Sequence, residues 1–543
     1  MINKIKQINR KRFIFISFSI IIFLFGIWYL QFFQIHINLF SKSFEIIRNL
    51  FAFKWDYLNN PNDNLWIWNL KKLFETIEII FSATAFSFFI ALITAFFSVP
   101  RIFQHKILIY TTRILILILR SFPILIFLTM FQKILGSQKI IAFSVYFWFT
   151  WLWLHRYFVE IIENSSFKKF YLSVLLGESK LIAFYKYLFL PNKNKLLMNF
   201  LLGIESNVRW SAILGIVGIF GIGDFFHTFT KIEDMKYLGI TILYIMLLVF
   251  FIEAILYTFN NFLFRENKYN LPQKSKWSIY RHKQIIKIVL FLFSLFYSLY
   301  GFMHILFDSS YIFNQNGFSE FFGTFFKLDF SEITNDPKVY LIYIKIAFQV
   351  YIVLFIGFFS AAFYSFFCAD KLHNISIVFL FKLLLSFIKA IPIIIFFIIF
   401  NPILSTYAAL TLSLAVSTFR SLAKQFNEHF NAISSKEINL LRDLGWSKWK
   451  IYIDFIFKKA LKFVLGNASF EIEGTYRNAM NYSMFIPSGI GIYELISRYS
   501  KYNQYGKIVP LLLPAIILFI SLELSYLFIK TKKFQKDNLR WTN

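Results

Sequence analysis

The sequence is poor in cysteine, acidic residues and glycine. Cys368 is the only cysteine among 543 residues, which excludes an intrachain disulfide and a cysteine-rich metal site. Only 29 residues are Asp or Glu, and 16% are charged in all, whereas about a quarter is usual in soluble domains. No Gly-x4-Gly-Lys-Ser/Thr sequence occurs, so ATP hydrolysis would need another chain. The eight histidines form no His-x-x-x-His or Glu-x-x-His pair, which argues against an intramembrane enzyme.

Apolar and basic residues are abundant instead. Apolar residues make up 58% of the chain and aromatic residues 22%, while 57 Lys and Arg give a formal net charge of +28. A soluble nucleic-acid-binding protein could carry that charge, but it would not repeat apolar runs of about 20 residues along its length. The composition therefore predicts an all-α polytopic membrane protein.

The apolar runs predict about twelve transmembrane helices, because about 20 residues cross a bilayer as a helix. The candidate spans are residues 13–33, 76–98, 107–133, 138–154, 196–220, 237–260, 285–306, 340–367, 375–400, 402–418, 461–485 and 507–529.

The distribution of charge predicts the orientation of these spans. Residues 1–12, 264–287 and 530–543 are rich in Lys and Arg, which mark cytoplasmic loops. The charged residues of 308–338 are instead mainly acidic, with five Asp or Glu against two Lys. We therefore expect a multi-pass protein of the cell membrane with both termini in the cytoplasm. Binding of lipid or nucleic acid by the basic runs is the alternative interpretation.

An internal repeat links the two halves of the chain. Shifting the sequence by 268 residues superimposes charged residues and glycines without a gap. The matches are Glu160 with Glu428, Leu176-Gly177 with Leu444-Gly445, Ser179-Lys180 with Ser447-Lys448, Glu205 with Glu473, Arg209 with Arg477, and Gly221-Ile222-Gly223 with Gly489-Ile490-Gly491. Each half has an even number of predicted spans, so both copies insert with the same orientation and form a tandem parallel repeat.

The repeat predicts five regions. They are an N-terminal helix and external segment (1–72), a first transmembrane domain (73–262), a basic linker with a helix and an acidic external loop (263–339), a second transmembrane domain (340–529) and a basic tail (530–543).

Each half contains a polar interruption, at 155–192 and 419–460, which we expect in the cytoplasm. Within each, apolar residues follow helical spacing up to Gly177 or Gly445, which suits a helix C-terminal cap. Such a helix either docks onto a partner protein or lies on lipid headgroups.

Two ion pairs lie at membrane depth. Glu205 and Arg209 are four residues apart, as are Glu473 and Arg477, so each pair shares one helix face. Asn207 lies between the first pair. A buried charge is costly in a membrane, so these groups either join helices or line a route for solute.

Glycines follow the first ion pair at Gly215, Gly218, Gly221 and Gly223, in a chain with only 19 glycines. They predict close backbone approach or a broken helix. Gly489 and Gly491 are the corresponding residues of the second half.

A cation also precedes a proline by three residues in each half. Arg120 precedes Pro123, and Lys389 precedes Pro392, both near the middle of a span. Each cation either bonds the carbonyls that the proline frees or lends positive charge to a pathway. Taken with the ion pairs, the intramembrane groups carry net positive charge, which favours an anionic solute such as a phosphoryl or phosphonyl compound.

The segment Glu205-x-Asn-Val-Arg209 followed by Gly215-x-Val-Gly218-x-x-Gly221-Ile-Gly223 resembles the membrane subunit of phosphonate-type ABC importers, which are type I permeases. The preceding Gly177 and Leu190-Pro191 fit the same family. The resemblance covers roughly residues 75–260 and, more weakly, 340–528. The two-in-one arrangement is similar to the large permease of mycoplasma high-affinity transport systems.

The resemblance implies a non-enzymatic permease of a binding-protein-dependent importer that works by alternating access. It implies an ATPase dimer in the cytoplasm, which would hold the ATP and Mg²⁺, and a solute-binding lipoprotein outside. The segments around Gly177 and Gly445 would dock onto the ATPase, with one copy of this chain in each complex. No cofactor is expected on this chain. A secondary transporter or channel that needs no ATPase is the alternative.

Overall fold

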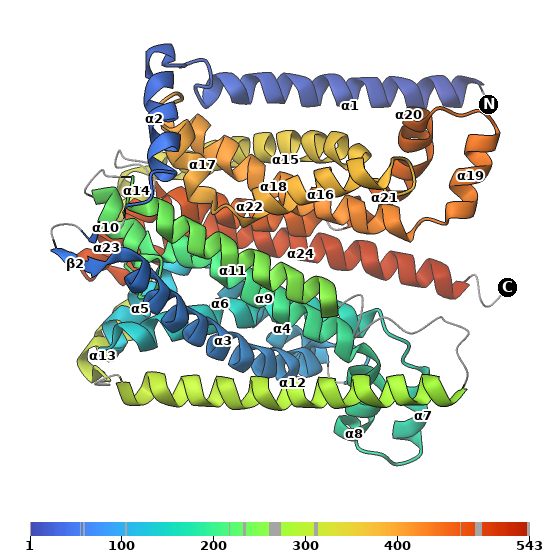
Figure 1. Ribbon diagram of the computed structural model, residues 1–543, viewed down its shortest axis with the longest axis horizontal. Helices are drawn as coiled ribbons and strands as arrows, with labels where there is room; N and C mark the ends of the chain where they lie inside the picture. Colours follow the sequence, from blue (N-terminus) through green and yellow to red (C-terminus); the bar gives the residue numbers. More distant parts are fainter. Residues whose placement is uncertain are drawn as a thin grey trace. The chain divides into compact units, whose positions relative to one another are not determined.

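A computed structural model describes most of the chain. The described residues are 2–54, 56–57, 60–103, 106–216, 218–231, 235–259, 273–308, 313–466, 468–483 and 491–539. They separate into two compact units, each with its own set of contacts (Figure 1). Unit 1 contains residues 1–48 and 324–543, and unit 2 contains residues 49–323.

Unit 2 is almost entirely helical. Its helices are α3 (Leu65–Ser98), α4 (Lys106–Ser121), α5 (Ile124–Ile134), α6 (Gln138–Glu163), α7 (Lys168–Leu175), α8 (Lys180–Phe184), the π-helical turn η2 (Tyr185–Phe189), α9 (Leu190–Ile216), α10 (Asp224–Lys231), α11 (Leu238–Thr258) and α12 (Gln273–Asp308). A small antiparallel hairpin of β1 (Asp56–Tyr57) and β2 (Asn60–Asn64) precedes α3.

Unit 1 is also built of helices. They are α1 (Ile2–Tyr29), η1 (Ile37–Leu39), α14 (Ser331–Asn335), η4 (Pro337–Tyr340), α15 (Leu341–Phe367), α16 (Ile375–Ala390), α17 (Ile393–Phe400), α18 (Thr406–Ala432), α19 (Ser435–Asp443), α20 (Lys448–Ile451), the π-helical turn η5 (Tyr452–Phe457), α21 (Lys458–Gly466), α22 (Ala468–Tyr482), α23 (Ile492–Lys501), η7 (Tyr505–Lys507) and α24 (Ile508–Leu539). The boundaries between the units fall within α2 (Phe40–Leu50) and α13 (Gln315–Phe325).

Among the described residues, five helical segments are long and apolar enough to cross a membrane, or seven spans if two bent helix pairs count as one span each. They are residues 65–98, 238–258, 281–307, 337–367 and 505–525, with the bent pairs α4–α5 and α16–α17. The chain is therefore a multi-pass membrane protein. The count of twelve spans stays a prediction, because several of the expected spans fall on helices that are short or interrupted by charge.

Small residues let the helices of unit 2 approach closely. Ala83, Ala91 and Ala95 of α3 are fully buried. The Ser87 hydroxyl of α3 donates to the Phe147 carbonyl of α6 over 2.7 Å, and a side chain at Gly301 of α12 would meet Ser82 of α3 at 2.5 Å. Helices without a hydrophobic driving force between them associate through such close packing.

Each unit contains a helix from the opposite half of the sequence (Figure 1). In unit 1, α1 packs on α15, where the Phe23 and Phe355 rings stack with centroids 4.3 Å apart and Tyr351 donates to the Ser19 carbonyl over 2.8 Å. In unit 2, α12 packs on α3. The sequence analysis assigned both helices to segments that flank the two domains and did not predict what either helix packs against.

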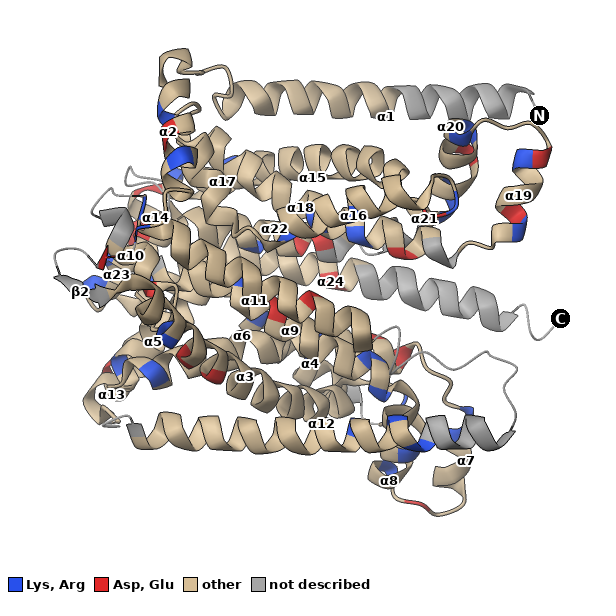
Figure 2. Cartoon of the chain, viewed as in Figure 1, with Lys and Arg blue, Asp and Glu red and all other residues tan. Residues whose placement is uncertain are grey.

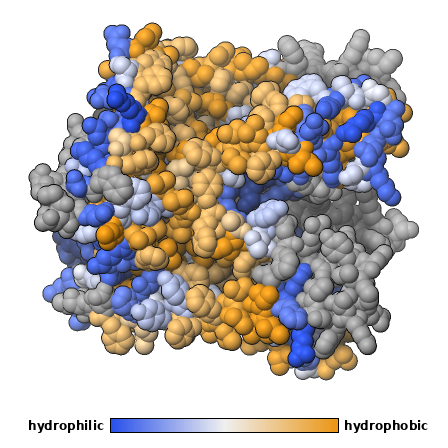
Figure 3. All heavy atoms as spheres, viewed as in Figure 1, coloured by the Kyte–Doolittle hydropathy of each residue, from blue (hydrophilic) through white to orange (hydrophobic). Residues whose placement is uncertain are grey.

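Charged residues gather at the ends of the helices (Figure 2). The middle parts carry apolar side chains, which cover the visible surface there (Figure 3). The charged residues along the middle of α9, α18 and α22 are exceptions, and they belong to the candidate site described below.

Candidate functional site

The first candidate feature is the turn between α7 and α8, residues 167–186, which we call the first corner. The helix predicted there is present and ends at Leu175, with Leu176 as its C-cap residue. Gly177 follows with φ +92°, its N–H donates to the Val174 carbonyl, and the Glu178 N–H donates to the Ser173 carbonyl, which together cap the helix. The Ser179 hydroxyl then accepts the Ile182 N–H at the start of α8.

A charged contact fixes the shape of the first corner. The Glu178 carboxylate accepts a hydrogen bond from Lys186 over 2.6 Å and another from the Ser173 hydroxyl. These two hydrogen bonds, that from Lys186 first, lower the pKa of Glu178 below its ordinary value. The corner therefore holds its carboxylate ionised at neutral pH.

The second corner, residues 434–453, has the same construction. Helix α19 ends at Leu444, Gly445 has φ +76°, and the Trp446 N–H donates to the Leu441 carbonyl. Ser447 caps the short helix α20 that follows. A π-helical turn comes next in both units, η2 in one and η5 in the other. Glycine fits both turns because other residues rarely adopt positive φ.

Both corners expose apolar side chains. Leu175 and Leu176 are 84% and 78% exposed in the first corner, and Leu444 is 65% exposed in the second. A methyl group added to either corner glycine would have no described atom within 4 Å, so both corner tips are open. Of the two glutamates assigned to these segments, Glu160 is half-buried near the end of α6 and Glu428 is exposed on α18.

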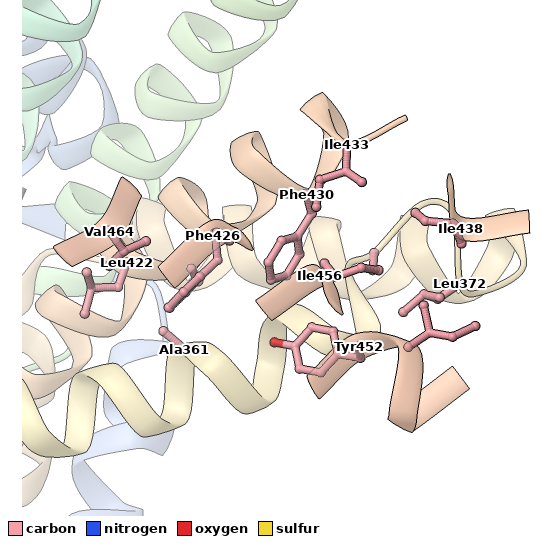
Figure 4. Close-up of a cluster of buried hydrophobic side chains, with 14 of the residues drawn as sticks. Ala361, Leu372, Leu422, Phe426, Phe430, Ile433, Ile438, Tyr452, Ile456 and Val464 are labelled. Carbon is pink, nitrogen blue, oxygen red and sulfur yellow. The ribbon is translucent and has the colours of Figure 1, made fainter. Parts of the chain in front are cut away.

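A buried cluster anchors the second corner to its unit (Figure 4). Ile438 of α19 lies near Leu372 and belongs to the same buried cluster as Phe426 and Phe430 of α18 and Tyr452 of η5. The exposed tip at Leu444 and Gly445 therefore stands on a rigid base.

Both predicted ion pairs form. In α9, Arg209 Nη1 lies 2.6 Å from Glu205 Oε1, and in α22, Arg477 hydrogen-bonds Glu473. The Glu205 side chain is 2% exposed while that of Arg209 is 27% exposed, so the guanidinium is the accessible end of the first pair. The second pair is buried at both ends, with Arg477 5.9 Å from the centroid of the Phe519 ring. A pair on one helix neutralises each charge where an isolated one would be costly.

Asn207 lies in a helix contact. Its amide nitrogen donates to Thr84 of α3 over 3.0 Å and to Thr150 of α6 over 2.7 Å, and the side chain is buried. Both amide hydrogens are used, so Asn207 holds α3, α6 and α9 together. Paired polar groups of this kind strengthen helix association in membranes.

The four glycines of the first half build a tight reversal between α9 and α10. A side chain on Gly215 would lie 1.9 Å from the Gly223 backbone, and one on Gly223 would lie 1.8 Å from the Ser211 carbonyl oxygen. Gly218 and Gly221 have positive φ, of +83° and +142°. The reversal is therefore closed by backbone packed on backbone, which only glycine permits.

The second half differs at this place. Gly491 begins α23, and a side chain there would lie 3.0 Å from the carbonyl oxygen of Ser483, the residue that corresponds to Gly215. The Ser483 hydroxyl accepts the Tyr493 N–H over 3.1 Å. Gly489 lies outside the described residues.

The proline-linked cations lie at sharp bends. Arg120 and Lys389 lie in the last turns of α4 and α16, and the following helices turn by 89° and 83°. Arg120 is buried and Lys389 is half-buried. The bends interrupt the helical hydrogen bonds, which leaves carbonyl groups to be satisfied.

In unit 1, Arg420 satisfies these carbonyls, and the sequence analysis did not predict this role. From α18, its Nη1 donates to the carbonyls of Ile388, Lys389 and Ile391 over 3.1, 3.2 and 2.9 Å. Its match in the first half is Leu152, so the repeat carried no signal for it.

Thr76 was also missed, because the repeat has no threonine at the matching position, Ile344. Its hydroxyl accepts the Ile222 N–H over 2.7 Å and so fixes the glycine reversal to α3. On the same reversal, the Phe220 ring lies 3.7 Å from Lys72 Nζ and 5.5 Å from Lys139 Nζ, and both lysines pair with Glu75. These contacts join residues far apart in sequence.

The chain is similar to two proteins that are each named ABC transport system permease protein p69. The protein from Mycoplasma genitalium is 24% identical over 504 residues, which cover 91% of each chain. That from Mycoplasma pneumoniae is 24% identical over 477 residues, which cover 85% of each. No family model matches the chain, and no solved structure matches it. The similarity to ABC transport permeases thus extends over nearly the full length of this chain.

Proposed function

We propose that this chain is the membrane-spanning permease subunit of an ATP-driven, binding-protein-dependent ABC importer. The two named relatives support a permease of an ABC transport system. The observation that carries the proposal within this chain is the pair of corners, because each has an exposed apolar tip on a glycine-capped helix. Such a tip suits insertion into a groove on an ATPase.

The corners also support a tandem repeat of two permease domains. The glycine with positive φ, the serine cap and the π-helical turn recur 267 or 268 residues apart in the sequence. The two Glu–Arg pairs recur at the same offset. A fused pair needs one copy per complex, with both termini on the side of the ATPase dimer and a solute-binding lipoprotein on the other.

The proposed cargo is a small anion that bears a phosphonate or phosphate group. Each Glu–Arg pair cancels its own charge, so Arg120 and Lys389 supply the excess of positive charge among the predicted intramembrane groups. Arg209 adds an accessible guanidinium, whose planar fork suits phosphoryl oxygens. Alternating access would move the solute from the lipoprotein towards the cytoplasm.

The test is reconstitution in liposomes with a candidate ATPase and a candidate solute-binding lipoprotein from the same organism. We expect uptake of radiolabelled methylphosphonate or phosphate only when ATP, the ATPase and this chain are all present. Uptake by the chain alone would instead support a secondary transporter or channel and would overturn the proposal.

A variant pair tests the corners directly. We expect Leu176→Ser together with Leu444→Ser to weaken co-purification of the ATPase, because both side chains are largely exposed and their loss creates no cavity within the chain. The matched control is Leu328→Ser, which changes an exposed leucine outside both corners. Equal ATPase recovery from all variants would count against docking at these corners.

A further inference from the structure

Unit 2 contains a cavity of about 540 Å³ beside the first corner. Its walls come from the loop between α3 and α4, from α4, from α7 and from the start of α8. The lining residues that carry the argument are Arg101, Phe103, Tyr110, Phe170, Tyr171 and Lys180. The volume falls within the range of about 300–1,000 Å³ that is typical of small-molecule sites.

The lining combines cations with aromatic rings. The Arg101 guanidinium lies 5.3 Å from the centroid of the Phe167 ring, and Lys180 Nζ lies 5.3 Å from that of Phe103. None of the described lining residues is acidic. Two cations held over rings, with the phenol groups of Tyr110 and Tyr171 beside them, favour an anion with several acceptor oxygens.

An exposed apolar stripe adjoins the cavity. Ile107, Tyr110 and Ile114 follow one another along one face of α4, and each is at least 50% exposed. In a membrane protein, such a face contacts acyl chains. A ligand with both a phosphate group and acyl chains would therefore fill the cavity and cover the stripe together.

The corresponding place in unit 1 is bridged by the chain itself. Arg442, which matches Val174, donates to the Lys371 carbonyl over 2.9 Å, and Lys371 Nζ in turn donates to the Ile433 carbonyl. The neighbouring Leu372 and Ile438 are packed in the buried cluster of Figure 4. The first corner has Val174 at this position, and Arg101 and Lys180 line a cavity at the place where unit 1 forms this bridge.

We propose that this cavity binds the phosphate group of an anionic phospholipid, which would tie the first corner to the membrane surface. The charge distribution predicts that the first corner lies at the cytoplasmic face, and a basic site there suits such headgroups, because anionic lipids give that surface a negative potential. The proposal needs a membrane chain but does not depend on the cargo or on ATP-driven transport. Free phosphate shares the headgroup chemistry and is distinguished by the experiment.

The experiment is native mass spectrometry of the purified full-length chain with phosphatidylglycerol, and with phosphatidylcholine as the neutral lipid. We expect Arg101→Gln together with Lys180→Gln to weaken phosphatidylglycerol binding about thirtyfold, since each cation near a membrane surface contributes about 1 kcal/mol. The matched control, Lys436→Gln with Lys448→Gln, removes the same charge from the second corner and should leave binding unchanged.

A second variant keeps both cations. Val174→Phe replaces a small lining side chain with a bulky aromatic ring and should also reduce phosphatidylglycerol binding, with the melting temperature measured alongside. Displacement of the lipid by millimolar inorganic phosphate, or equal binding of phosphatidylcholine, would overturn a phospholipid site. Unchanged phosphatidylglycerol binding by both cavity variants would overturn the proposal altogether.

Discussion

The glycine reversal between α9 and α10 allows a sharp prediction about Gly215. A methyl group there would lie 1.9 Å from the Gly223 carbonyl carbon and 2.1 Å from its oxygen. Carbon atoms pack at roughly 3.5 Å, so the two backbones would have to separate by about 1.5 Å. No change of rotamer relieves the contact, because both partners are backbone.

The cost follows from this geometry. Overpacking that side chains can absorb costs about 1–3 kcal/mol, so a clash between two backbones should cost about 3 kcal/mol. Separation of the backbones also strains the hydrogen bond from the Ile222 N–H to Thr76, which contributes about 1 kcal/mol. We therefore expect Gly215→Ala to destabilise unit 2 by about 3–4 kcal/mol.

Gly203→Ala is the matched control on the same helix. Its methyl group would meet Thr84 at 3.4 Å and Thr150 at 3.6 Å, which are ordinary contacts. Alanine is a better helix former than glycine by about 1 kcal/mol, so this variant should be neutral or more stable.

The assay is thermal unfolding in detergent, followed by size-exclusion chromatography of a fluorescent fusion. We expect the melting temperature of Gly215→Ala to fall by about 6–16 °C and that of Gly203→Ala to stay unchanged or to rise by about 2–4 °C. Equal melting temperatures for the two variants would refute the backbone-on-backbone interpretation.

Three further predictions concern polar groups. Arg420→Gln should lower the free energy of unfolding by about 2–4 kcal/mol, and the melting temperature with it, because three carbonyls lose their donor. The control Lys382→Gln should lower that free energy by less than about 1 kcal/mol, because it breaks only an exposed ion pair. Asn207→Leu should lower the free energy of unfolding by about 2 kcal/mol, because two buried hydroxyls lose their donor. Asn207→Asp, whose carboxylate cannot donate, should be destabilised at least as much in the same thermal-unfolding assay. The pKa of Glu178 is lowered in the folded chain, so its contribution is present at neutral pH and is lost as the pH falls through that lowered pKa. The protection factor of the first corner, which compares the measured hydrogen-exchange rate with the intrinsic rate at the same pH, should therefore fall in acid in the wild type, and Glu178→Gln should show low protection at every pH. A wild-type protection factor that does not change with pH would contradict this.

Sequence reasoning was most successful with features that lie within one helix or turn. The two Glu–Arg pairs form because residues four apart share a helix face. Gly177 and Gly445 cap helices as their positions after apolar stripes predicted, since a helix end needs positive φ at that residue. The bends after Arg120 and Lys389 follow from the prolines.

Sequence reasoning could not find contacts between distant segments. Arg420 lies about 30 residues from the carbonyls that it satisfies, and Thr76 lies 146 residues from the N–H that it accepts. The sequence left open whether Asn207 joins helices or lines a solute path, and its contacts with Thr84 and Thr150 depend on which helices pack around α9. Periodicity reports which face of a helix is apolar or polar and does not identify its neighbour.

By itself, the sequence determined that this protein is a helical membrane chain, that its two halves carry matching motifs, and that helices end at Gly177 and Gly445. These properties depend on composition and on spacings of three or four residues, which physical chemistry translates directly into local structure. Only the tertiary structure decided that α1 packs with the second half and α12 with the first, and that one corner is bridged while the other encloses a cavity. Those outcomes depend on complementary shapes and hydrogen-bonding groups brought together from distant parts of the chain, which no local pattern records.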